Sequence, residues 1–243
     1  MEEGAKIKLR EKSSKFIEGT RVGIPIAIGY IPIAITFGLI AKSLGIPNLI
    51  SIFMSLSVFA GASQFIGVNL IASGATAVEI IMTTFILNFR HFLMSSSLSQ
   101  KIERTATKRL LSVLAFGITD ETFAVASLRN EEKINPWFLL GLNSIAFTSW
   151  VLGTCIGIFI GDALPEELKS SMNIALYAMF IGLLIPEIKN SKPAFLVSSI
   201  AIGINCLLKW ASVFSFISTG WSIIISTIIA ALIGAALYKK EGE

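Results

Sequence analysis

Long apolar stretches alternate with short polar and charged stretches along the whole chain. Most of the apolar stretches approach or exceed the roughly 20 residues that a helix needs to bridge a hydrocarbon core of about 30 Å. Hydropathy separates eight such segments, at 21–41, 48–73, 77–98, 110–128, 137–160, 172–186, 194–217 and 220–238. Because lipid offers no hydrogen-bond partner to free backbone groups, nearly all of these residues must be helical. The pattern predicts an all-α integral membrane protein, a bundle of about seven to eight transmembrane helices of which some are broken or re-entrant.

The composition excludes a soluble globular enzyme. Of the 243 residues, 53% are hydrophobic and 15% charged, and the mean hydropathy is +0.75, whereas roughly a quarter of an ordinary soluble domain is charged. The net charge is +4, and the basic residues lie at chain ends and in loops, where they contact anionic lipid rather than nucleic acid. The two cysteines, Cys155 and Cys206, lie in apolar stretches and form no disulfide framework or metal-binding pattern. We therefore expect no cofactor.

Charge also predicts how the chain is divided and oriented. We expect a basic cytoplasmic N-terminal arm at 1–20, one transmembrane domain at 21–238 and a cytoplasmic tail at 239–243. Eight plain crossings would then place the basic loop 99–109 outside, against the tendency of basic loops to stay in the cytoplasm. That loop returns to the cytoplasm if one of the first three segments, and also 110–128, enters the membrane and returns on the same side. Both arrangements remain open.

Three charged residues lie deep inside apolar segments: Arg90, Asp120 and Glu121. Each would cost about 3 kcal/mol if it faced lipid unpaired, so we expect them to be paired, hydrated or neutralised. Neighbouring side chains project about 100° apart on a helix, so Arg90 can meet only one of the two carboxylates in ideal geometry. The other carboxylate could carry a coupling proton. The alternative is an ion pair that only fixes the helix register.

Polar residues also form a stripe on the third segment. Thr84, Asn88, His91 and Ser95 fall within about 40° of one helix face, which favours a polar neighbour or a water-lined cavity. We take Asn88 and His91 as candidate substrate contacts. For His91, the only histidine in the chain, the alternative is a structural imidazole that bonds across helices.

Two further segments carry residues that interrupt helices. Gly29 and Pro32 lie in the first segment, where Pro32 lacks the N–H that would bond the Ile28 carbonyl, leaving that oxygen free for a substrate ammonium or an ion. The second segment contains Gly61, Ser63 and Gln64, and Gln64 offers both a donor and an acceptor in mid-membrane. These five residues complete the candidate substrate-binding set. The alternative for the second segment is close helix packing through small residues.

Four strings in order identify a resemblance. They are GYIP at 29–32, VFAGASQF at 58–65, NFRHFLMSSSL at 88–98 and TDETFA at 119–124. With them the chain resembles the AzlC-type azaleucine-resistance family, the large subunit of bacterial branched-chain amino-acid exporters. The resemblance implies a secondary active transporter that exports branched-chain and other hydrophobic amino acids, driven by an ion gradient, with a proton as the expected coupling ion. It also implies a small membrane partner subunit of the AzlD type and a multi-pass protein of the cell (inner) membrane, with both termini expected in the cytoplasm.

Two other classes of function fit the sequence less well. The chain has neither the H-E-x-x-H pattern of a metalloprotease nor the G-x-S-x-G pattern of a hydrolase, and the carboxylates at 120 and 121 lack a second catalytic aspartate on another span. We therefore expect that the protein is not an enzyme. A scaffold without transport activity would have little use for costly intramembrane charges.

Overall fold

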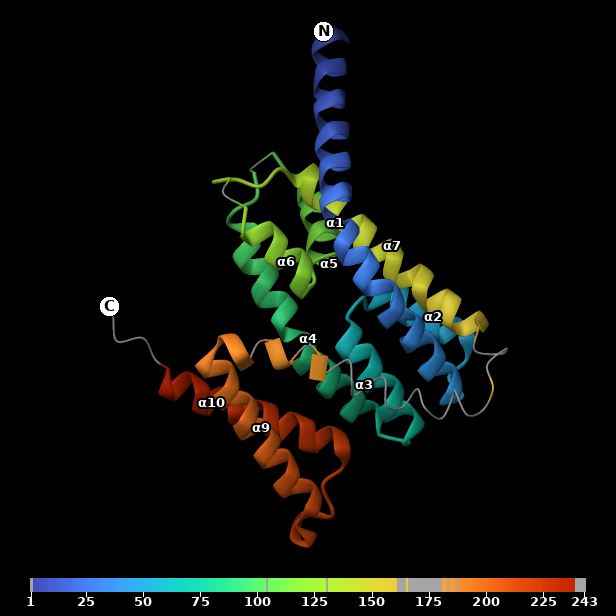
Figure 1. Cartoon of the computed structure of the whole chain (residues 1–243), viewed down its shortest axis with the longest axis vertical. Helices are drawn as coiled ribbons and strands as arrows, with labels where there is room; N and C mark the ends of the chain where they lie inside the picture. The colour runs from blue at the N-terminus through green and yellow to red at the C-terminus, as the bar shows by residue number, and fades with distance from the viewer. Residues whose placement is uncertain are drawn as a thin grey trace.

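The computed structural model describes residues 2–103, 105–129, 131–160, 165, 181–182, 184–186 and 188–238 (Figure 1). Within these residues the regular elements are helices, with one isolated bridge between Ile102 and Ile134. The helices are α1 (Glu2–Ser43), α2 (Asn48–Ser57), α3 (Gly61–Ala72), α4 (Ala77–Ser99), α5 (Lys108–Phe116), α6 (Asp120–Ser127), α7 (Pro136–Ile160), α9 (Lys192–Trp210), η1 (Ser212–Phe214) and α10 (Thr219–Leu237). The predicted all-α membrane fold is confirmed. Most of the predicted segment 172–186 and the whole tail 239–243 lie outside the described residues.

The described part of the chain contains five to six candidate spans, broadly consistent with the seven to eight predicted for the whole chain. In the described part of the chain, five helices are long and apolar enough to cross a membrane: α1, α4, α7, α9 and α10. Helices α5 and α6 pass this test only as a pair, and they are bent by 120° at the break between them. The predicted segment 48–73 is two helices of 10 and 12 residues, about 15 and 18 Å long at 1.5 Å per residue, or roughly half a hydrocarbon core each.

Helices α1 and α7 lie side by side and run in the same direction (Figure 1). Glycines allow their backbones to touch: a Cβ atom on Gly19 would lie 1.9 Å from the carbonyl oxygen of Phe138, and one on Gly38 would lie 2.4 Å from that of Thr154. The residue numbers of the contacting residues increase together along both helices, from Gly19 with Phe138 to Gly38 with Thr154. The two helices are therefore parallel. Small residues at such contacts let transmembrane helices pack closely.

The prolines of the first segment do not break it. Pro25 and Pro32 lie inside the continuous helix α1, which also includes residues 2–20. Both prolines are exposed, on the face turned away from α7. Transmembrane helices tolerate proline, because neighbouring groups can satisfy the backbone groups that it frees. The expected break in 21–41 is therefore absent, and α1 continues through both prolines while its glycine face packs against α7.

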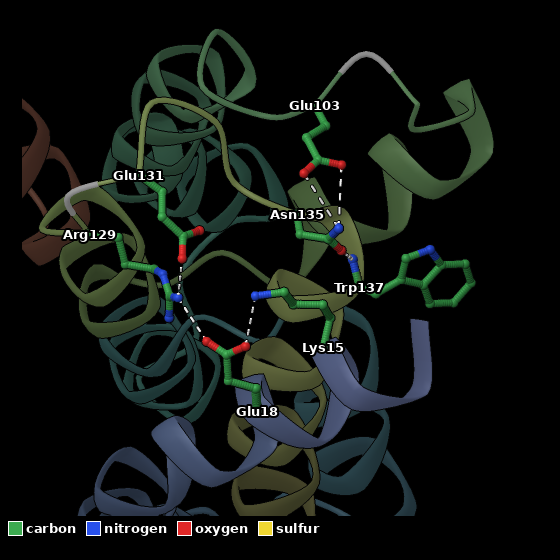
Figure 2. A network of polar contacts seen from close by, with 7 residues as sticks. All are labelled: Lys15, Glu18, Glu103, Arg129, Glu131, Asn135 and Trp137. Atoms are coloured by element: carbon green, nitrogen blue, oxygen red, sulfur yellow. Dashed lines mark hydrogen bonds and ion pairs between the residues drawn. The ribbon is translucent and has the colours of Figure 1, made fainter. Parts of the chain in front are cut away.

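Polar contacts join three parts of the chain at one end of the molecule (Figure 2). Asn135, just before α7, donates to the Glu103 carboxylate in the loop after α4 at 3.3 and 3.4 Å. Arg129, just after α6, pairs with Glu18 of α1 at 2.8 Å and lies 4.0 Å above the Phe138 ring. The loops after α4 and α6 therefore lie on the same side as Glu18 of α1 and the start of α7. We call this the near side and the opposite one the far side.

These contacts support the arrangement with re-entrant segments over eight plain crossings. Helices α1 and α7 both run from the near side to the far side. The chain between them must therefore cross the membrane an odd number of times to get back from the far side to the near side. Helix α4 ends on the near side, and among the described residues it is the one helix between α1 and α7 that is long enough to cross by itself. It therefore makes this crossing alone. The α2–α3 pair therefore enters from the far side and goes back, and the α5–α6 pair does the same from the near side. The basic loop 99–109 joins the N-terminal side, as the re-entrant alternative requires. Each unit is a spanning helix followed by a re-entrant pair, and the two units are inverted.

The C-terminal helices α9 and α10 form a hairpin that contacts α4 (Figure 1). Glu79, in the first turn of α4, is only 3% exposed. Its carboxylate accepts hydrogen bonds from the Gly220 N–H at 2.7 Å and from the Ser218 hydroxyl. Glu79 thus caps the start of α10. The side chain of Ser218, the N-cap residue of α10, makes no capping hydrogen bond itself.

We expect cysteine labelling to separate this topology from eight plain crossings. In a background without Cys155 and Cys206, single cysteines would replace exposed Ser73 and Lys101, which lie before and after α4. An impermeant maleimide should label position 101 from the same face of the membrane as position 133, and position 73 from the opposite face. Ser43, at the end of α1, and Lys133 serve as references.

Eight plain crossings reverse both results, because residue 73 would then share a side with residue 133, and residue 101 with residue 43. Labelling in that reversed pattern would overturn the re-entrant arrangement.

Candidate functional site

The breaks of the two re-entrant pairs meet at a cavity of about 680 Å³. The far-side pair α2–α3 contributes Phe59 and Ala60, which lie between its two helices, and Gly61, the first residue of α3. From the near-side pair the cavity is lined by Thr119 and Asp120. Helices α1, α4 and α7 form the remaining walls, and Gly182, Leu184 and Pro186 also contribute. The cavity thus lies where two elements that enter from opposite sides end against each other.

The charged residues predicted from the sequence come together in this cavity. Arg90 Nη1 of α4 lies 2.6 Å from Asp120 Oδ2 of α6, and both side chains are about half exposed toward the open space. His91 and Glu121 also line the cavity. Arg90 therefore pairs with Asp120, and the neighbouring Glu121 points elsewhere, as the 100° rotation between adjacent residues requires.

Glu121 faces a partner that the sequence analysis missed. The hydroxyl of Tyr30, on α1, lies 2.7 Å from Thr119 Oγ1 and also contacts the Glu121 carboxylate. Tyr30 itself is 8% exposed. Thr119 is the N-cap of α6 and forms a capping box with Thr122, which explains why the helix begins at this point. The only sequence signal for Tyr30 is its place in the GYIP string.

The start of α3 lies at the cavity. The first N–H groups of a helix have no partner within it, and the N-cap Ala60 supplies no side-chain hydrogen bond. Gly61 and Ala62, the first residues of α3, both line the cavity. A Cβ atom on Gly61 would lie 2.8 Å from the Trp150 ring, so glycine is needed for this close approach. Phe59, at the break, has φ +44°, in the left-handed region that few side chains adopt.

Aromatic and aliphatic side chains form the apolar part of the lining. Trp150 of α7 packs edge to face with Tyr30 at a centroid distance of 5.6 Å, and Phe59 does so at 6.5 Å. Ile33 of α1 and Ala62 of α3 complete this wall. The cavity therefore combines a charged and polar wall with an apolar one.

Gln64 and Ser63 support the cavity from behind without lining it. Gln64 is fully buried: its Oε1 accepts a hydrogen bond from Trp150 Nε1 at 3.0 Å, and its Nε2 donates to Ser55 Oγ at 2.9 Å. Ser63 donates to the Ala60 carbonyl at 3.0 Å. The amide that we expected to contact substrate is thus used by the protein, where it fixes the Trp150 ring and the α2–α3 break.

Gly29, Pro32 and Asn88 lie outside the cavity lining. Gly29 and Pro32 are exposed on α1, and a Cβ atom on Gly29 would meet nothing within 4 Å. Asn88 lies on α4 close to His91, but among the residues of the predicted polar stripe only His91 lines the cavity. Thr84 instead donates to the Ile80 carbonyl of its own helix at 2.7 Å.

Comparison with known proteins places the chain in a family. The family described as AzlC protein matches residues 25–164. An uncharacterized membrane protein of Archaeoglobus fulgidus is 35% identical over 235 residues, 96% of this chain and 98% of that protein. The inner membrane protein YgaZ of Escherichia coli is 34% identical over 197 residues, 79% of this chain and 80% of YgaZ.

A third relative has a name that states a function. The branched-chain amino acid transport protein AzlC of Bacillus subtilis is 26% identical over 188 residues, 76% of this chain and 73% of that protein. No solved structure matches the chain. The family and this relative support a role in membrane transport. The chain belongs to the AzlC protein family.

Proposed function

We propose that the chain is a secondary active transporter that exports branched-chain and other hydrophobic amino acids across the cell membrane. The observation that carries this proposal is the composition of the cavity, which offers a cation, two carboxylates and an apolar wall within about 680 Å³. A zwitterionic amino acid with an aliphatic side chain needs these three kinds of contact. The name of the Bacillus subtilis relative supports the same substrate class.

Each end of such a substrate has a complementary group in the cavity. The substrate carboxylate would accept charge-assisted hydrogen bonds from Arg90 and from the uncapped N–H groups at Gly61 and Ala62. Its ammonium would bind Asp120 or Glu121. Without substrate, the ion pair between Arg90 and Asp120 keeps either charge from being left unpaired in a membrane.

The inverted re-entrant pairs suggest how the cavity opens alternately to the two sides. Each pair ends at the cavity but is anchored on a different side of the membrane, so movement of one pair opens a path to that side only. Discontinuous helices that meet at mid-membrane are used in this way by other transporters. A proton taken up by a cavity carboxylate would couple the cycle to the membrane potential. One charge moved through 100 mV supplies about 2.3 kcal/mol, enough for roughly fiftyfold accumulation.

The proposal includes a small membrane subunit of the AzlD type and a location in the inner membrane with both termini cytoplasmic. In the described part of the chain, α9 packs on α10 and η1, and its remaining faces expose Phe195, Ile202 and Leu207. This leaves apolar surface for a partner helix. The shared side of the α1 start and the basic loop 99–109 agrees with a cytoplasmic N-terminus.

Counterflow in proteoliposomes tests the proposal. We expect vesicles that contain this chain and its small partner, preloaded with leucine, to accumulate labelled leucine at least tenfold faster than empty vesicles. Isoleucine and valine should compete, because they offer the same charged ends and a similar aliphatic side chain. Lysine and glutamate should not, because the apolar wall of Ile33, Phe59 and Trp150 has no partner for a third charge. Equal competition by lysine, or no leucine counterflow at all, would contradict the proposal.

A further inference from the structure

We infer that Glu121, held by Tyr30, is the group that binds the coupling proton in this cavity, and that a proton and the substrate ammonium compete for its carboxylate. Asp120 is then the fixed partner of Arg90. The inference rests on the proposed transport function and assigns separate roles to two adjacent acids that the sequence could not distinguish.

The two carboxylates differ in their partners. Asp120 lies 2.6 Å from a guanidinium nitrogen of Arg90, so a proton on Asp120 would break an ion pair inside the membrane. Glu121 takes part in none of the ion pairs found among the described residues. It can gain a proton without leaving a cation unpaired. Since unpaired charge is costly in a membrane, the proton belongs on Glu121.

Tyr30 can satisfy Glu121 in both protonation states. A phenol has one hydrogen to donate and an oxygen that also accepts. When Glu121 is ionised, Tyr30 donates to the carboxylate, which it contacts directly. When Glu121 is protonated, its O–H donates to the Tyr30 oxygen, and Tyr30 donates to Thr119 Oγ1, 2.7 Å away. Rotation of one hydroxyl is enough to change from one state to the other, and no buried polar group loses its partner.

Few other titratable groups surround Glu121. Helix α6 packs against α1, α4 and α7. Around the cavity these elements supply Tyr30 from α1, Arg90 and His91 from α4, and Trp150, which does not titrate, from α7. On α6 itself the neighbour is Asp120, already paired with Arg90. His91 is therefore the only other candidate for the proton among the cavity residues described.

Competition for one carboxylate produces exchange transport. Either the substrate ammonium or a proton can neutralise the Glu121 carboxylate. Only one of them can do so at a time. Binding of the amino acid then releases a proton from Glu121 to water, and protonation on the other side of the membrane displaces the amino acid. The coupling is thus an antiport in which amino-acid export accompanies proton entry.

The dependence of leucine affinity on pH tests the inference. For the wild-type complex in detergent, we expect the apparent Kd for leucine to rise about tenfold for each unit that pH falls below the titration midpoint, and leucine binding to release a proton to an indicator dye. Glu121→Gln should bind leucine more weakly and show neither effect. Tyr30→Phe should keep the slope but move the midpoint to higher pH, because the hydrogen bond that the phenol donates to the ionised carboxylate is stronger than the one that it accepts from the protonated acid.

Two matched variants serve as controls. Asp120→Asn and His91→Gln should each retain the pH slope and the proton release, whatever their effect on the affinity itself. Loss of the slope in either of them, with its retention in Glu121→Gln, would overturn the inference. If both acid variants fail to bind leucine, Tyr30→Phe decides: a shifted midpoint supports the inference and an unchanged one overturns it. A wild type that binds leucine independently of pH overturns the inference alone, whereas a wild type without leucine binding overturns the proposed function.

Discussion

Replacement of Arg90 with glutamine is expected to reduce leucine counterflow by about tenfold to a hundredfold. The guanidinium is the one cationic side chain among the described residues that line the cavity, and a hydrogen bond to a charged group contributes roughly 1.5–3 kcal/mol. The same change leaves Asp120 without its partner at 2.6 Å. We therefore expect both a higher KM for leucine and a lower maximal rate.

A charge exchange makes this prediction specific. The double variant Arg90→Asp with Asp120→Arg should recover part of the lost activity, because the ion pair is rebuilt in reverse. Recovery should be partial, since an arginine in the first turn of α6 faces the positive end of the helix dipole. The matched exchange of Arg90 with Glu121 should recover nothing, because Glu121 points toward Tyr30. Counterflow rates in proteoliposomes measure all three variants, and rescue by the Glu121 exchange instead would show that we have paired the wrong acid.

Arg129→Gln is the control for loss of a basic side chain. Arg129 pairs with Glu18 and Glu131 on the near side, away from the cavity lining. Its removal should leave the leucine KM within about twofold of the wild-type value, because Arg129 lies outside the cavity lining and cannot contact a substrate bound there. A similar loss of activity in this variant would mean that the effect of Arg90→Gln is not specific to the cavity.

Hydropathy located the helices of this fold but could not tell which of them cross the membrane. Segment 48–73 is long enough for one span, yet it contains the break at 58–60, where Phe59 has a positive φ. Nothing in the residue types marks that turn as a reversal. The basic loop 99–109 was the better guide, because its charges required a chain that returns to the same side. The inverted relation of the two units depends on the direction of helices, which composition does not record.

The charged residues of the candidate site could be predicted from the sequence, because burying a charge in a membrane is costly. The residues whose role depends on contacts with distant parts of the chain could not. Arg90, Asp120 and Glu121 stood out because charge is rare inside apolar segments. Tyr30 did not, because its role depends on α6, about 90 positions away along the chain. Gly29 and Pro32 suggested a break, but α1 is continuous and both residues are exposed on it.

Gln64→Leu is expected to cause a large loss of stability. The side chain joins three elements: Oε1 accepts from Trp150 Nε1 of α7 at 3.0 Å and from the Ala60 N–H at 3.3 Å, and Nε2 donates to Ser55 Oγ of α2 at 2.9 Å. Leucine has a similar volume but leaves Trp150 Nε1 and the Ala60 N–H without this partner in the core, whereas Ser55 keeps its hydrogen bond with Thr154. Each buried group without a partner costs about 1–3 kcal/mol, so we expect a total of about 3–5 kcal/mol. For a chain of this size that is a fall of roughly 10 °C in the Tm.

Asn69→Leu, on the same helix, isolates the contribution of the network from that of an amide in general. Asn69 is exposed, and its Nδ2 donates to the Phe65 carbonyl of its own helix at 2.8 Å. We expect its loss to change the Tm by less than about 2 °C, because no buried group is left unpaired. Thermal unfolding in detergent, followed by tryptophan fluorescence, compares the two variants. Equal shifts would mean that the Gln64 network does not fix the α2–α3 break to α7, and Trp150 would then lack the support that holds it against Gly61 at the cavity.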